Sequence, residues 1–141
     1  MREKERQLVD SICRDICKTG QLTDRQKQTL QNTFGKRFKS ALKALEDGAV
    51  KKYVFEPSQR TVWIVVGKER DYQIIPDVNF CSCDDFYFHV LKGESTLCYH
   101  LIAQKLADSL GRYALISDSD ELYEALMKDW RFIKRDNSTT E

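Results

Sequence analysis

The sequence has 141 residues, and its 23 basic and 22 acidic side chains leave a formal net charge of +1 at pH 7. This length suits one globular domain that folds without disulfides, and 41% hydrophobic with 32% charged residues excludes collagen-like and low-complexity classes. The near-neutral charge gives no broad positive field that would attract nucleic acid.

Residues 1–49 are expected to form an N-terminal helical region. Apolar side chains four positions apart predict a first helix with one buried face, on Leu8, Ile12 and Ile16. Thr23 and Gln26 have capping-box spacing and indicate where a second helical run begins. The apolar stripe of that run is Leu30, Phe34, Phe38, Ala41 or Leu42, and Leu45. Gly35 is expected to kink or split it, because glycine inside a helix costs about 1 kcal/mol relative to alanine.

The chain changes to strand-forming residues after Val50. Three β-branched and aromatic runs, separated by turn residues, predict an antiparallel meander with strands at 50–55, 61–66 and 72–75. Two helices are expected next, at 84–91 and 97–110, the second ending at Gly111. A last helix is expected from about Asp118 to Phe132, with Leu122, Leu126, Trp130 and Ile133 on its apolar face.

These elements predict the α+β fold class and a single compact domain. Its regions are expected to be the N-terminal helices (1–49), the meander with a metal-binding finger (50–116), the C-terminal helix (117–135) and a flexible tail (136–141). No apolar run approaches the length of a membrane span, and the first residues are too charged for a secretory signal. We therefore expect an intracellular protein, nuclear if the source is eukaryotic and cytoplasmic if it is archaeal.

Four residues form the pattern that carries chemistry: Cys81, Cys83, Cys98 and His100. In an extended segment, residues two apart project to one side, so Cys81 and Cys83 can face the same ion. Ser95 or Thr96 is expected to cap the following helix and place Cys98 in its first turn, where backbone amides favour a thiolate. Three sulfurs and one imidazole make a closed tetrahedral shell for one structural zinc ion. The alternatives are an iron–sulfur cluster, which usually has a fourth cysteine, and simple core packing.

The pattern Cys81-x-Cys83, a spacer and Cys98-x-His100 resembles the SWIM zinc finger. Its extension to Ala103, together with residues 80–91 and 97–101, resembles the small SWIM-domain subunits of Shu complexes; residues 1–50 carry little of the match. The resemblance implies a ββα-like finger and an accessory role in homologous recombination and DNA repair. It also implies a RecA-like recombinase paralog as partner, and support for recombinase assembly on single-stranded DNA through that complex.

Two further surfaces are predicted to serve such a function. Ala103, on the finger helix, and Trp130, on the last helix, are expected to bind the protein partner, since large aromatic side chains can anchor an interface. Lys36, Arg37, Lys39 and Lys43 belong to the densest basic stretch, which can contact phosphates. The alternative for these basic residues is a solvated helix face whose phenylalanines point inward, and for the last helix it is core packing.

The remaining cysteines and histidine are expected to have structural roles. Cys13 and Cys17 lie on the apolar stripe of the first helix, which favours core packing over a second metal site, and His89 is expected to pack in the spacer of the finger. No phosphate loop or catalytic triad is recognisable, so we expect a protein without enzymatic activity. The alternatives are a SWIM module that binds DNA or protein in another pathway, and an enzyme with an open zinc position.

Overall fold

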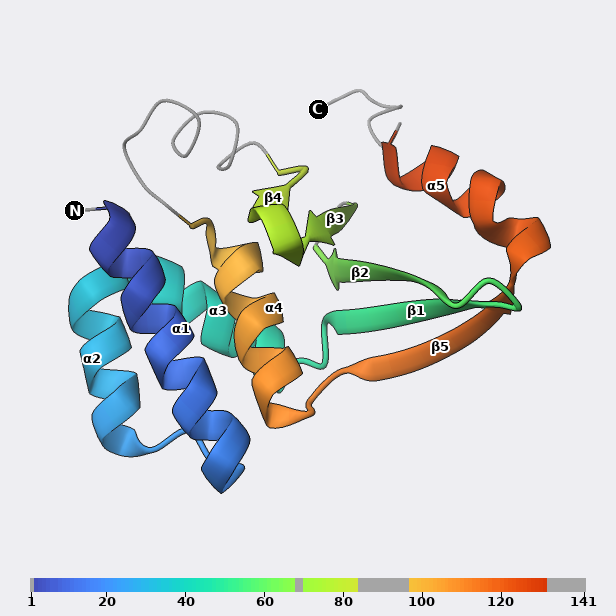
Figure 1. Ribbon diagram of the computed structural model, residues 1–141. Helices are drawn as coiled ribbons and strands as arrows, with labels where there is room; N and C mark the ends of the chain where they lie inside the picture. The colour runs from blue at the N-terminus through green and yellow to red at the C-terminus, as the bar shows by residue number, and fades with distance from the viewer. Residues whose placement is uncertain (1, 68–69, 84–96, 132–141) are drawn as a thin grey trace.

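The computed structural model describes residues 2–67, 70–83 and 97–131 (Figure 1). In chain order its elements are α1 (Arg2–Thr19), α2 (Asp24–Phe34), α3 (Lys36–Glu46), β1 (Val50–Glu56), β2 (Arg60–Val66), β3 (Asp71–Ile75), the 3-10 helix η1 (Pro76–Val78), β4 (Phe80–Cys81), α4 (Tyr99–Leu110), β5 (Ala114–Ser119), the 3-10 helix η3 (Asp120–Leu122) and α5 (Tyr123–Arg131). The mixture of helices with one sheet confirms the predicted α+β class. Across these residues, no helix has the length and apolar character needed to cross a membrane.

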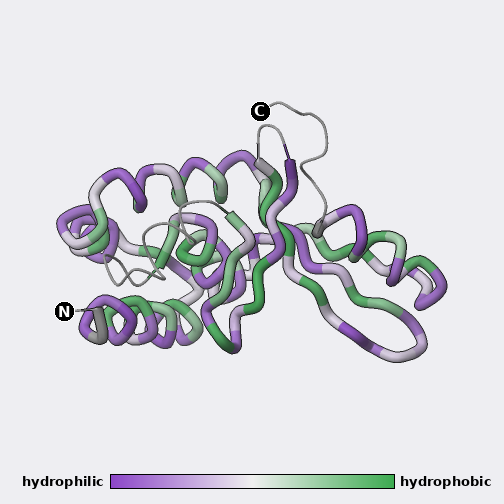
Figure 2. Tube along the Cα trace, turned by 90° about the horizontal axis from the view of Figure 1, so that it is seen from above, coloured by the Kyte–Doolittle hydropathy of each residue, from purple (hydrophilic) through white to green (hydrophobic). Residues whose placement is uncertain are grey.

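The N-terminal helices form where the sequence predicts them. Thr23 and Gln26 complete a reciprocal capping box: the Gln26 amide donates to Thr23 Oγ1 at 3.1 Å, and the Thr23 amide donates to Gln26 Oε1 at 2.9 Å. Gly35 has φ +58° and ψ −123°, a conformation that favours glycine, and it separates α2 from α3. The alternation of hydrophobic and hydrophilic residues along these helices is visible in Figure 2. Ile12 and Ile16 are buried, as their spacing predicts.

The sheet confirms the meander and adds a strand that the sequence analysis missed. The strand order is β4-β3-β2-β1-β5, and β1, β2 and β3 pair antiparallel in turn. β5 pairs parallel to β1, with Ala114 beside Lys51 and Ser119 beside Glu56. The prediction of a helix starting at about Asp118 is therefore wrong at its start, because this residue lies in a strand. The segment is a half-polar edge strand, so it lacks the regular apolar alternation by which buried strands are recognised.

Helices cover both faces of the sheet. On one face α4 lies between the sheet and the N-terminal helices, and this side holds the larger core cluster, which includes Trp63, Val65 and Leu101 (Figure 1). α5 packs on the opposite face, where Phe55 and Trp130 belong to a smaller cluster with Val62 and Ile64. Alternate side chains of β2 thus pack into different core clusters, since successive side chains of a strand point to opposite faces.

The turn between β1 and β2 is fastened to the start of the C-terminal helical segment. The Ser58 amide donates to Asp120 Oδ2 at 3.0 Å, and the Ser58 hydroxyl donates to Asp120 Oδ1 at 2.7 Å. Ser119 caps the same segment by accepting a hydrogen bond from the Glu121 amide at 3.1 Å. These contacts orient α5 against the sheet at the end of the molecule far from the N-terminal helices.

Candidate metal centre

Cys81 and Cys83 are brought to one point by a short turn and a two-residue strand. After β3, Pro76 begins the 3-10 helix η1, and Asn79, the residue that caps its end, reverses the chain with a φ of +52°. β4 then pairs antiparallel with β3, and Cys81 lies opposite Ile74. Ser82, between the two cysteines, extends this pairing: its hydroxyl accepts from the Gln73 amide at 3.0 Å, and its amide donates to the Gln73 carbonyl at 3.1 Å. The two thiols therefore lie on the same side, as their i, i+2 spacing predicts.

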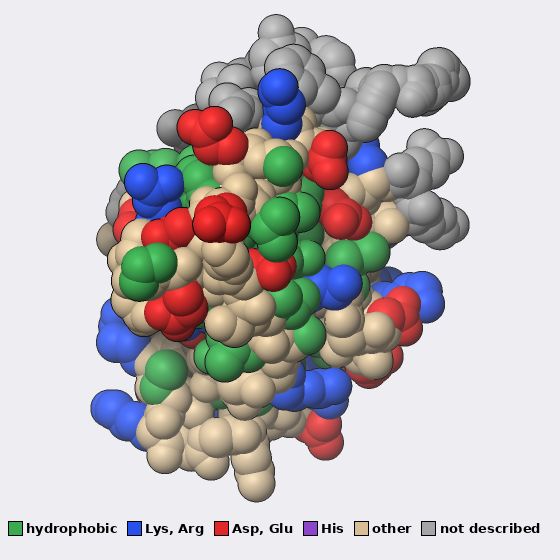
Figure 3. Space-filling model, turned by 90° about the vertical axis from the view of Figure 1, so that its right-hand side faces the viewer, with side chains coloured by type: hydrophobic (Ala, Val, Ile, Leu, Met, Phe, Trp, Pro, Cys, Tyr) green, Lys and Arg blue, Asp and Glu red, His purple; other side chains and the backbone are tan. Residues whose placement is uncertain are grey.

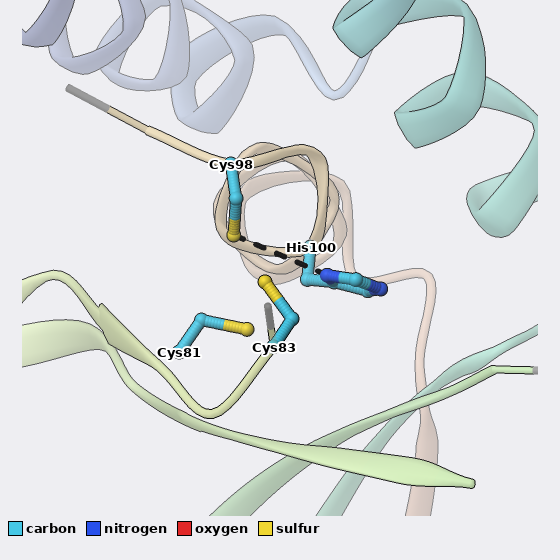
Figure 4. A group of neighbouring side chains, drawn as sticks. All are labelled: Cys81, Cys83, Cys98 and His100. Carbon is cyan, nitrogen blue, oxygen red and sulfur yellow. Dashed lines mark hydrogen bonds between the residues drawn. The ribbon is translucent and has the colours of Figure 1, made fainter. Parts of the chain in front are cut away.

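Cys98 and His100 come from the start of α4, directly across from that strand (Figure 4). Cys98 is itself the N-cap residue of α4, and its carbonyl accepts from the Ile102 amide at 3.2 Å. This corrects the expectation that Cys98 lies within the first turn behind a cap at Ser95 or Thr96, two residues outside the described part of the chain. Leu97, buried in the core, leads the chain into the helix at this point.

The four side chains form a compact, buried group. One ligand atom from each of Cys81, Cys83, Cys98 and His100 lies within 4.8 Å of all the others. Cys98 Sγ is 4.0 Å from Nδ1 of His100, so Nδ1 is the ring nitrogen turned toward the sulfurs (Figure 4). Zinc–sulfur bonds of about 2.3 Å in a tetrahedron separate the sulfurs by about 3.8 Å, so a small contraction of this group fits zinc. With four donors the shell is closed, which is typical of a structural rather than a catalytic ion.

The electrostatics of the group favour a bound cation. Hydrogen bonds from the neighbouring thiols lower the pKa of Cys83, and the bond from Cys81 has the largest effect. Burial raises the pKa of Cys81. For Cys98 the hydrogen bond with Cys81 lowers the pKa, but contact with Cys83 and burial outweigh it and raise the value to about 12. One thiolate thus suppresses the ionisation of the other two, and a divalent cation removes this repulsion by binding all three as thiolates.

The two side chains expected to bind the partner are inside the molecule. Ala103 is fully buried on α4, and Trp130 is 5% exposed and packs edge-on against Tyr53, with ring centroids 4.9 Å apart. Both belong to core clusters, so the expectation that they form an exposed docking surface is corrected. The reason is that helices cover both faces of the sheet, which turns the apolar stripes of α4 and α5 inward.

The predicted basic stretch lies on α3. Lys36, Lys39 and Lys43 are exposed, Arg37 is half-buried, and Lys43 forms an ion pair of 3.2 Å with Asp47. The neighbouring phenylalanines, Phe34 and Phe38, are buried in the core, as in the alternative of a solvated helix face. Lys36, Arg37, Phe34, Ser40 and Tyr99 line a surface pocket of about 310 Å³ beside the start of α4. The basic face and the metal centre are therefore neighbours.

The predictions for the two remaining cysteines and for His89 have different outcomes. The Cys13 thiol packs against the core and lies 3.6 Å from the Lys105 carbonyl oxygen, and burial raises its pKa, which confirms core packing. Cys17 is exposed, so core packing is wrong for it. His89 and the helix expected at 84–91 lie outside the described residues. Sequence reasoning did not single out Gln104, which is buried on α4 one turn after His100; its position four residues after a predicted metal ligand was the available signal.

A closed cluster of three cysteines and one histidine, held between a strand and a helix start, defines a zinc-finger type of centre. The chain is 32% identical over 133 residues to the mouse zinc finger SWIM domain-containing protein 7, a match that covers 91% of this chain and 86% of the relative. The human protein of that name is 27% identical over 117 residues, covering 82% of this chain and 83% of the relative. A Dictyostelium discoideum homolog is 29% identical over 110 residues, covering 77% and 70%.

The chain therefore belongs to the family of zinc finger SWIM domain-containing protein 7. The names of these relatives describe a zinc finger and no catalytic activity. No family model matches the sequence, and no solved structure matches it. The SWIM resemblance recognised from the ligand pattern is thus supported by relatives that align along most of the chain.

Proposed function

We propose that this protein is a non-catalytic accessory factor in homologous recombination and DNA repair, with one structural zinc ion. In this role it binds a RecA-like recombinase paralog and supports assembly of the recombinase on single-stranded DNA. The observation that carries the proposal is the buried Cys81, Cys83, Cys98 and His100 group in a chain of the SWIM domain-containing protein 7 family. The closed ligand shell favours a binding function, because it offers no position for water or substrate.

The charge distribution supports two separate binding surfaces, one for the protein partner and one for DNA. At the end where α5 and the β1–β2 turn lie, acidic side chains stand beside hydrophobic ones (Figure 3). Glu121, Glu124 and Asp129 are exposed there, and Leu122 is 47% exposed. Such a surface repels phosphates and suits a protein partner. The basic α3 face, on the other side of the sheet, is the surface suited to DNA.

The first experiment tests the protein partner. The purified chain is mixed with purified RecA-fold recombinase paralogs of its source organism and analysed by size-exclusion chromatography with light scattering. A stoichiometric complex with one paralog is expected, and Leu115→Glu is expected to weaken it, because Leu115 is a large hydrophobic side chain that is 65% exposed on the edge strand β5. Val78→Glu is the matched control, since Val78, at the end of η1, is 69% exposed. If no paralog forms a complex, the accessory role is wrong.

The second experiment tests the contact with DNA. Single-stranded DNA binding is measured by fluorescence anisotropy over a series of salt concentrations, for the chain alone and with its partner. Lys36→Gln and Lys39→Gln are each expected to lower the slope of log affinity against log salt by roughly one in the complex, while the exposed Lys18→Gln on α1 leaves it unchanged. Tight, steeply salt-dependent binding by the chain alone, with no gain from a paralog, would instead indicate a DNA-binding SWIM module of another pathway.

A further inference from the structure

Two buried polar atoms on α4 have no hydrogen-bond partner among the described residues: Nε2 of His100 and Oε1 of Gln104. The two side chains are 4% and 1% exposed, so water does not replace the missing partners. Leaving such a group unpaired costs about 1–3 kcal/mol. Two groups of this kind on one helix, a ring nitrogen that can carry a proton and a carbonyl oxygen that can accept a hydrogen bond, therefore call for a common explanation.

The helix places these two side chains next to each other. Residues four apart lie on the same face of a helix, one turn above the other. Helical side chains also lean toward the N-terminus, so the carboxamide of Gln104 lies over the turn that carries His100. The other end of the imidazole is already assigned, because Nδ1 faces the sulfur of Cys98 at 4.0 Å. Nε2 is thus at the far end of the ring from the sulfurs (Figure 4).

Two tyrosines restrict the orientation of the imidazole. The ring of Tyr72, from β3, has its centroid 4.2 Å from that of His100, and the ring of Tyr99 has its centroid 3.9 Å away. A flip of the ring, which exchanges the positions of Nδ1 and Cδ2, would have to move against both contacts. The packing therefore fixes which nitrogen meets the metal, and it leaves the Nε2 proton to be bound by a group that reaches it along the helix.

We propose that Gln104 is the positioning residue of the metal centre: its carboxamide oxygen accepts a hydrogen bond from Nε2–H of His100 when Nδ1 binds the metal. A histidine ligand commonly donates its second N–H to such an acceptor, which fixes its tautomer and raises its basicity as a ligand. A rotation of the Gln104 side chain forms the bond and satisfies both buried atoms together. The inference rests on zinc binding at this cluster and is independent of the recombination partner.

The direct test is NMR spectroscopy of the zinc-loaded, 15N-labelled full chain. The imidazole nitrogen shifts of His100 are expected to show Nδ1 bound to zinc and Nε2 protonated, with an Nε2–H proton that exchanges slowly. Gln104→Met keeps the length of the side chain and removes the acceptor, so the Nε2–H proton is expected to exchange much faster. Gln104→Glu retains an acceptor oxygen and is expected to restore the slow exchange.

Zinc affinity, measured by competition with a chromophoric chelator, gives a second readout. Gln104→Met is expected to bind zinc 10–100-fold more weakly, the usual effect of losing an outer partner of a metal ligand. Leu106→Met is the matched control, because it also places methionine at a buried α4 position but away from the ligands, and it is expected to leave the affinity unchanged.

Binding of zinc through Nε2 in the wild-type protein would overturn the inference, and this measurement does not depend on any variant folding. The inference is also wrong if Gln104→Met keeps both the wild-type affinity and the slow exchange. A wild-type protein that binds no zinc would instead contradict the metal centre itself, so the two failures are distinguishable.

Discussion

The two faces of the sheet are built on different principles. On the α4 face, the core cluster contains Cys81, Cys83 and Cys98 among its aliphatic residues, so the metal centre and the hydrophobic core are one structure. On the α5 face, the cluster around Phe55 and Trp130 is held by aromatic packing. Phe55 meets Tyr123 edge-on there, with ring centroids 5.1 Å apart.

This difference indicates that metal binding and folding are coupled on the α4 face. The ligands come from β4, a strand of only two residues, and from the N-cap of α4. A strand of this length has little stability of its own, so a metal that joins it to the helix start stabilises the contact between sheet and helix. On the α5 face the described contacts are those of aromatic side chains, which bury large areas. Loss of metal and loss of aromatic packing should therefore have separable effects.

The largest expected effect is that of Cys83→Ala on the α4 face. A structural zinc site contributes about 10–16 kcal/mol in zinc-finger peptides, which is comparable to the whole stability of a domain. We therefore expect one zinc per wild-type chain, and a variant that retains no zinc and loses its cooperative thermal transition. Elemental analysis and circular dichroism measure the two quantities.

Cys17→Ala is the matched control for this change, because Cys17 is exposed on α1. It should keep both the zinc and the melting temperature. A wild-type protein that melts at the same temperature before and after complete chelation would contradict the coupling of metal and core.

Trp130→Ala should destabilise the other face while the zinc stays bound. Removing a buried tryptophan typically costs about 3–5 kcal/mol, from lost burial and the cavity left behind. Urea denaturation followed by circular dichroism measures this cost, and the zinc content of the folded variant is expected to equal that of the wild type. Leu122→Ala, at a half-exposed position, should change stability by less than about 0.5 kcal/mol. Loss of zinc from the Trp130 variant would mean that the two faces are one cooperative unit.

Ala103→Leu tests how tightly α4 packs beside the metal ligands. Ala103 is fully buried one turn after His100, so a larger side chain must displace its neighbours, at a cost of about 1–3 kcal/mol. Chemical denaturation measures the loss. Ala125→Leu, on the exposed side of α5, is the control and should have little effect. An Ala103→Leu protein of unchanged stability would show that the core around Ala103 can accommodate a larger side chain.

The smallest effect is expected at the β1–β2 turn, which is fastened to the start of the C-terminal helical segment. Ser58→Ala removes the hydroxyl that donates to Asp120 Oδ1 at 2.7 Å, and should cost about 1 kcal/mol of stability. Amide hydrogen exchange is expected to rise at the β1–β2 turn and at the start of α5, and to stay unchanged in α4. Ser117→Ala, at an exposed position of β5, is the matched control. Equal exchange in the two variants would mean that the Ser58 hydroxyl does not help to hold the turn against Asp120.

The sequence predicted the features that depend on neighbouring residues. The capping box at Thr23 and Gln26, the helix break at Gly35 and the three meander strands each follow from residues a few positions apart. That the side chains of Cys81 and Cys83 point to the same side follows in the same way from the two-residue period of an extended chain. Even the family could be recognised locally, because the four ligands stand in two short motifs.

Tertiary structure alone decided the features that depend on distant contacts. β5 is a strand because β1, more than fifty residues earlier, offers a free edge, and a polar edge strand has no alternating pattern to reveal it. Ala103 and Trp130 are buried because helices cover both faces of the sheet. The nitrogen of His100 that faces the sulfurs is selected by the rings of Tyr72 and Tyr99, together with the position of Cys98. A sequence pattern fixes spacing along one element, but burial and ring orientation arise only when elements pack against each other.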